Sequence, residues 1–214
     1  MNKTYGSSAS ARIDPQKLEK MKISFLFSFV LLISALLGML VVNYISTEIY
    51  ANSLFRLSNH FETVFLRCSD FVGYAKIIAQ YSLYDIIALL IIFASSFSML
   101  NYLLTDIVLF YSGIKFGISV AFLINFSKLS DLSYSIGNTR LALFVFAELA
   151  IIAILLYYSC YSAMSSLNFR RTDTSGRPNI KTSDLISFAV KTAACVGATL
   201  ILNTLYCFLL YILK

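Results

Sequence analysis

The fold is decided by residues 85–126, which read DIIALLIIFASSFSMLNYLLTDIVLFYSGIKFGISVAFLINF. Counted from 85 to 126, these 42 almost continuously apolar residues would reach about 63 Å as one helix, at about 1.5 Å per residue. The hydrocarbon core of a bilayer is only about 30 Å thick. The stretch must therefore fold back. Its most polar part, Asn101–Asp106, predicts a tight hairpin between two spans, 84–103 and 107–126.

The composition of the whole chain places it in a membrane. Of its 214 residues 58% are hydrophobic and 13% are charged, and the mean hydropathy is +0.77. Soluble domains average about 45–50% apolar and about 25% charged residues, and disordered chains are more polar still. Three further apolar windows are long enough to cross a bilayer: 23–45, 141–159 and 185–213. We predict an all-α polytopic membrane protein with a single five-span domain, 23–213.

The positions of lysine and arginine predict the orientation of the spans, because cytoplasmic segments carry an excess of these residues. A cytoplasmic N-terminal tail, 1–22, and a cytoplasmic loop, 160–184, would together hold nine of them, against six on the outer side. The densest clusters are Lys17–Lys22 and Arg170–Arg171. We therefore expect the N-terminus inside and the C-terminus outside. A re-entrant segment at 101–106 would instead place the C-terminus inside.

The segment between the first two spans, 46–83, is the largest extracytoplasmic piece. Its apolar residues recur at steps of three and four, which predicts an amphipathic helix lying in the membrane interface and ending near Gly73. This helix is either a connector that rests on lipid or on the bundle, or a docking surface for a partner. The candidate docking residues are Leu54, Leu57, Phe61, Phe65 and Phe71.

Two ionisable residues fall deep inside predicted spans: Lys115 in the third and Glu148 in the fourth. An unpaired charge at the centre of a spanning helix costs roughly 2.5–3.5 kcal/mol on insertion scales. Because the two spans run in opposite directions, the two residues lie at depths that differ by only about 6 Å. We therefore predict an intramembrane Lys115–Glu148 pair. It either fixes the register of the two helices or lines a path for protons or ions.

Small residues mark candidate helix-packing faces. Gly113 and Gly117 form a GxxxG motif in the third span, and Ser34 and Gly38 stand four residues apart in the first. Such spacing lets the backbones of two spanning helices approach closely. The sequence leaves open whether these faces meet each other or another copy of the chain.

The sequence contains no recognisable catalytic constellation. The lone histidine, His60, has no spaced carboxylate or cysteine partner, and the phosphate-binding, dinucleotide-binding, metalloprotease and nucleophile-elbow motifs are absent. Asp85 and Asp106 lie at predicted span ends, where we expect them to cap helices or face headgroups. The basic residues cluster beside the predicted spans, so the net charge of +6 reflects the membrane topology rather than nucleic-acid binding. We expect a non-enzymatic protein without cofactor or metal.

Three spans carry short motifs of one known family. They are ISALLG with VN at 33–43, LFYSGIKFG with VAFLIN at 109–125, and the glutamate of FAELA at 146–150. These stretches resemble the stage II sporulation protein M family. Many relatives carry a Pro-His-Gly triplet shortly before the glutamate, where this chain has Leu143, Phe144 and Val145, so the resemblance is a divergent one.

The resemblance implies a bacterial protein of endospore formation. Such a protein would sit in the mother-cell membrane at the septum and help recruit a septal peptidoglycan-remodelling complex of cell-wall hydrolases for engulfment. Three hypotheses follow for this chain: a membrane scaffold of this kind, a small permease or transporter subunit with a Lys115/Glu148 path, or a structural membrane protein. The residues alone do not separate the scaffold from the transporter.

Overall fold

The computed structural model describes residues 15–44, 71–126, 138–170 and 181–212, and within these ranges the chain is helical apart from the turn at 96–100 and Lys181. The helices are α1 (Pro15–Tyr44), α3 (Phe71–Ser95), α4 (Asn101–Phe126), α5 (Asn138–Arg170) and α6 (Thr182–Ile212). All five are long and apolar enough to cross a membrane. The predicted all-α, five-span membrane architecture is confirmed.

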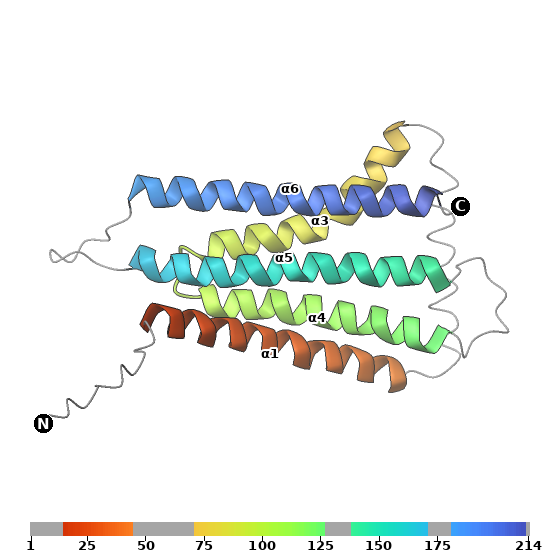
Figure 1. Cartoon of the computed structure of the whole chain (residues 1–214), viewed down its shortest axis with the longest axis horizontal. Helices are drawn as coiled ribbons and strands as arrows, with labels where there is room; N and C mark the ends of the chain where they lie inside the picture. Colours follow the sequence, from red (N-terminus) through yellow and green to blue (C-terminus); the bar gives the residue numbers. More distant parts are fainter. Residues whose placement is uncertain (1–14, 45–70, 127–137, 171–180, 213–214) are drawn as a thin grey trace, which may run out of the picture.

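The helices alternate in direction along the chain (Figure 1): α1, α4 and α6 run one way, and α3 and α5 run the other. The start of α1 and the end of α6 therefore lie at opposite ends of the bundle. α5 lies at the centre and contacts each of the other four helices, whereas the most extensive contact between two helices joins α1 to α4. This central position explains why α5 contributes so many buried residues.

The turn between α3 and α4 is not where the sequence predicted it. The chain turns at 96–100, and α4 begins at Asn101, so the predicted hairpin at Asn101–Asp106 is wrong. Asn101 and Thr105 of that stretch are buried instead of solvated. Asn101 Oδ1 accepts hydrogen bonds from the hydroxyls of Ser95, at 2.9 Å, and Thr105, at 3.2 Å. A full hairpin nevertheless joins the two spans, because α3 and α4 both qualify as membrane-crossing helices.

α5 is longer than predicted. It continues past the expected end at Ser159 to Arg170, so the expected cytoplasmic loop at 160–184 is wrong over its first part. The extra turns belong to the core: Ser162, Ser166 and Phe169 are all buried. The serines of this stretch are polar in the sequence but face the other helices rather than water. Burying a serine is tolerable where its hydroxyl finds a partner, as that of Ser162 does with Ser96.

The predicted outer segment falls partly outside the described residues. Leu54, Leu57, Phe61 and Phe65 belong to 45–70 and are not described, whereas Phe71 is the first residue of α3. Gly73 lies inside the first turn of α3, so the expected helix end at that residue is wrong. In Figure 1 this end of α3 is angled away from the other helices.

A cluster of aromatic rings lies at the end of the bundle that holds the α3–α4 turn. There the fully buried ring of Phe188 on α6 stacks on Phe93 and Tyr158, with ring centroids 5.3 Å and 6.1 Å apart. It also meets Phe169 edge to face at 5.6 Å. Aromatic contacts of this kind stabilise a fold beyond simple burial of area. They tie α3, α5 and α6 together at this end.

Candidate intramembrane site

The small residues of α1 and α4 face each other within one chain. A Cβ added at Gly113 would overlap the Ser34 hydroxyl, and one added at Gly117 would overlap the carbonyl oxygen of Ala35. A Cβ at Gly38 would overlap the carbonyl oxygen of Ile114 in the same way. Real Cβ atoms do not approach other atoms so closely, so glycine is required at these three positions. The two motifs thus form one helix–helix contact.

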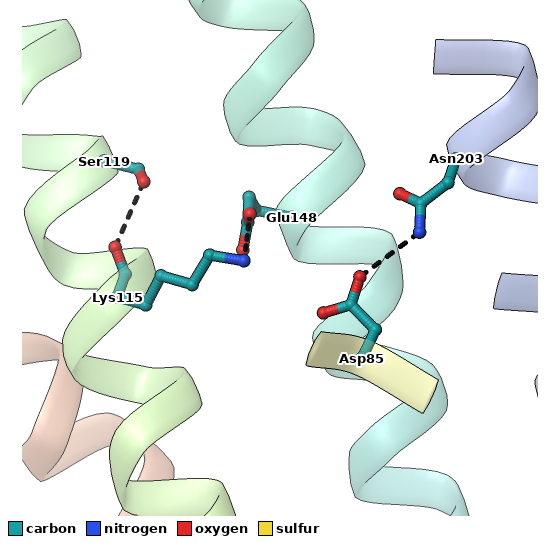
Figure 2. Close-up of polar contacts among 5 residues, drawn as sticks. All are labelled: Asp85, Lys115, Ser119, Glu148 and Asn203. Atoms are coloured by element: carbon teal, nitrogen blue, oxygen red, sulfur yellow. Dashed lines mark hydrogen bonds and ion pairs between the residues drawn. The ribbon is translucent and has the colours of Figure 1, made fainter. Parts of the chain in front are cut away.

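This contact determines where Lys115 points. Lys115 stands two residues from Gly113 and two from Gly117, which is about 200° around an α-helix from either glycine. Because the glycine face of α4 lies against α1, the opposite face is turned toward the other helices. Lys115 projects from that opposite face toward α5 (Figure 2).

Lys115 and Glu148 form the ion pair that their depths suggested. Lys115 Nζ lies 2.7 Å from Glu148 Oε1, and the Glu148 side chain is only 8% exposed while that of Lys115 is 40% exposed. Lys115 lies about 21 Å along α4 from Asn101, and Glu148 lies about 15 Å along α5 from Asn138. The pair is therefore far from either end of its helices. It is the geometry expected of an intramembrane pair, in which each partner offsets the desolvation of the other.

A second buried carboxylate joins the site, and sequence reasoning misplaced it. Asp85 was expected at a span end, but α3 begins at Phe71 and places Asp85 about 15 Å from its far end at Ser95. Asp85 is buried, and its Oδ2 accepts a hydrogen bond of 3.2 Å from Nδ2 of Asn203 on α6. The signal that could have revealed it is Asn203, the only asparagine in the last apolar stretch, 185–213. Asp106, by contrast, lies in the second turn of α4, near the turn.

The three charged residues line one pocket of about 640 Å³ between α3, α4 and α5. Asp85, Lys115 and Glu148 supply its charges, and most of the remaining lining is isoleucine, leucine, valine and alanine. Two tyrosines at its rim, Tyr84 and Tyr111, are 68% and 65% exposed, so the pocket opens on the outer surface of the bundle. It combines apolar walls with a few charged groups, which is the usual make-up of a small-molecule site.

A second pocket, of about 270 Å³, adjoins the first between α4 and α5. It extends along α4 as far as Phe122 and shares two lining residues, Tyr111 and Lys115, with the larger pocket. Lys115 therefore stands at the junction of the two. Ser112 lines only the larger pocket and Ser119 only the smaller one.

The described residues contain no group of three or more histidine, cysteine, aspartate or glutamate side chains placed to hold a metal ion. His60 is outside the described residues.

Compared with known protein families, with curated proteins and with solved structures, the chain matches none of them.

Proposed function

We propose that this protein is a small multi-pass membrane transporter whose path runs through the Asp85–Lys115–Glu148 pocket. The observation that carries the proposal is the position of Lys115, which is paired with Glu148 at the junction of two pockets. Charged residues inside a membrane are rare and commonly mark solute or ion pathways. A purely structural pair needs neither a hollow beside it nor a third charge.

The two pockets together cover much of the membrane. Along α4 their lining runs from Ile107 to Phe122, a length of about 22 Å out of a hydrocarbon core of about 30 Å. Lys115 lines both pockets, so its pair with Glu148 lies at the boundary between them. Breaking and remaking this pair would connect the site to one half of the membrane at a time, as alternating access requires.

Thiol labelling tests the path. In a background without the native cysteines, Ser112→Cys and Ser119→Cys keep the ion pair and flank it in the larger and the smaller pocket. We expect a membrane-impermeant thiol reagent to label Ser112→Cys from the side of the α3–α4 turn and Ser119→Cys from the opposite side. Adding Glu148→Gln should let each position be labelled from both sides.

The matched control is Phe110→Cys, an exposed position on α4 that lines neither pocket. It should stay unlabelled, because thiols that face lipid lack the water needed to form the reactive thiolate. Labelling of both serine positions no faster than this control would contradict the proposed path.

We further propose that the N-terminus is cytoplasmic, in a bacterial cell membrane. The support for the orientation is the excess of lysine and arginine in 1–22 and in the segment that follows α5. The support for a bacterial membrane is the resemblance of three spans to the stage II sporulation protein M family. With this orientation the α3–α4 turn lies inside and the smaller pocket lies in the outer half. Reporter fusions at Lys214 check it: activity of an extracytoplasmic reporter is expected, and activity of a cytoplasmic reporter would contradict it.

The competing proposal is the septal scaffold, and its support is the resemblance of three spans to the stage II sporulation protein M family. Under that proposal the lipid-embedded bundle anchors a cell-wall hydrolase complex and residues 46–83 meet the partners. Depletion in the host during starvation tests it by imaging of membrane-stained cells. Asymmetric septa that fail to thin and engulf would support the scaffold, whereas normal engulfment would contradict it.

A further inference from the structure

We propose that the larger pocket binds a lipophilic organic cation, a molecule with one positive charge on an apolar body, which reaches the site from the bilayer. Its role as a transported solute rests on the proposed function, whereas the binding site itself does not. Four observations lead to this class of ligand. They are the charge of the pocket, its apolar lining, its opening toward lipid and the exposure of Lys115.

The first argument is charge. With both carboxyl groups ionised, Asp85 and Glu148 bring two negative charges to the pocket and Lys115 brings one positive charge, so one negative charge is left for a proton or a bound cation to neutralise. An uncompensated charge at this depth is costly. A bound monovalent cation makes the cluster neutral, whereas an anion would add to the surplus and a neutral molecule would leave it.

The second argument is the nature of the walls. Apart from the charged groups and Ser112 the lining is apolar or tyrosine, as with Ile91, Ile107 and Leu155. A small hydrated ion would exchange its water for hydrocarbon on most sides and gain little. An apolar body gains from burial of its surface against these side chains. The volume of about 640 Å³ is that of sites for drug-sized molecules.

The third argument is access. The rim residues Tyr84 and Tyr111 are exposed on the outer surface of helices that cross the membrane, so the pocket opens toward lipid. A molecule that partitions into the bilayer reaches such an opening directly. The tyrosine rings at this rim suit a cation, because the face of an aromatic ring attracts positive charge.

The fourth argument concerns Lys115, whose ammonium group acts as a tethered cation at Glu148. Its side chain is 40% exposed and rests on Glu148, which is almost fully buried (Figure 2). Asp85 is held by Asn203 through one of its two carboxylate oxygens. A bound cation would share Glu148 and Asp85 with the lysine ammonium. Removing the lysine charge should therefore strengthen cation binding.

Calorimetric titration of the full chain in lipid nanodiscs, with empty nanodiscs as the baseline, tests the proposal. The ligands are tetraphenylphosphonium and tetraphenylborate, which have nearly the same shape and opposite charge. We expect saturable binding of the cation alone. Asp85→Asn should weaken it by at least about tenfold, because a charged partner at the binding site is lost.

Two further variants separate a binding effect from a folding effect. Lys115→Gln should bind the cation more tightly than the wild type, a change that misfolding cannot produce. Asp184→Asn removes an exposed carboxylate at the start of α6 and should bind as the wild type does. Equal binding of the two ligands, or no change with Asp85→Asn and Lys115→Gln, would overturn the proposed site.

The thiol-labelling experiment keeps this proposal distinct from the transport function. Labelling at Ser112→Cys and Ser119→Cys without cation binding would leave the path in place and refute the class of solute. Cation binding without labelling would leave the site in place and refute transport through it.

Discussion

The two faces of α4 pack in opposite ways, although both lie inside the bundle. The face toward α1 has no room for a single added carbon atom at Gly113 or Gly117, whereas the face toward α3 and α5 borders a pocket of about 640 Å³. Within a membrane, helices gain little from hiding apolar surface, because lipid is equally apolar. Close backbone contact is what binds α1 to α4. The pocket on the other side therefore lies beside a rigid contact, and Lys115 projects from that side.

Substitutions at the face of α4 that packs against α1 should destabilise the fold more than substitutions at the face that borders the pocket. Gly117→Val would drive side-chain carbons into the backbone carbonyl of Ala35 on α1, and backbone cannot move aside as a side chain can. We expect a loss of about 3 kcal/mol or more, at the upper end of the range for overpacked positions. Unfolding by SDS titration from mixed micelles measures it.

Gly197→Val on α6 is the matched control for that loss. An added Cβ at Gly197 meets nothing within 4 Å, so the same change should leave the stability of the bundle nearly unaltered. Similar losses at Gly117 and Gly197 would mean that the effect is one of valine in a helix and not of the contact with α1.

The face of α4 that borders the pocket should tolerate larger side chains, but it should not tolerate an unpaired charge. Glu148→Leu leaves the ammonium of Lys115 without its partner 2.7 Å away. Breaking a fully buried pair costs about 3–5 kcal/mol, and the exposure of Lys115 reduces the expected loss to about 2 kcal/mol. The same SDS titration checks it. Wild-type stability would show that the pair contributes nothing to the fold.

The hydrogen bond between Asp85 on α3 and Asn203 on α6 should contribute less to the stability of the fold than the ion pair does. Asn203→Leu removes the donor that lies 3.2 Å from Asp85 Oδ2, and we expect a loss of about 1 kcal/mol in the same titration. Thr204→Ala is the control, because the Thr204 hydroxyl donates a hydrogen bond to the backbone carbonyl of Leu200 on its own helix. A loss at Asn203 no larger than at Thr204 would contradict a role in holding Asp85.

Much of the bundle could be predicted from the sequence, because length and apolarity are local properties. The five spans needed only the thickness of a bilayer, and the Lys115–Glu148 pair needed only depth along two opposed helices. The α3–α4 turn could not be placed in the same way. Asn101 and Thr105 are polar, and polarity suggested a solvated turn, but both are buried, and Asn101 Oδ1 accepts hydrogen bonds from the hydroxyls of Ser95 and Thr105 inside the protein.

The rest of the candidate site depends on tertiary arrangement. Asp85 was misplaced because a charged residue was taken to end a span, whereas its partner Asn203 lies 118 positions away in the sequence. The small residues were found, but which helix they meet depends on how α1 lies against α4. A pocket formed by three helices has no local signal at all, since each wall is an ordinary apolar stretch.

The smallest expected effect on stability is also the one that best separates structure from function. Lys115→Met combined with Glu148→Leu replaces the ion pair by apolar side chains of similar length, and such replacements are commonly neutral or stabilising. We expect the double variant to unfold within about 1 kcal/mol of the wild type and to recover the loss caused by Glu148→Leu alone. Lys191→Met, which removes an exposed lysine stacked on Tyr161, is the control for losing a cation.

The same double variant should lose function while it keeps the fold. Without Lys115 and Glu148 the pair that closes the junction between the two pockets is gone, so one-sided labelling of Ser112→Cys and Ser119→Cys should disappear. If stability and one-sided labelling both survive, the pair is dispensable and the path must lie elsewhere. If stability falls as far as with Glu148→Leu alone, the pair serves to hold α4 on α5, and the comparison between a closed and an open face of α4 fails.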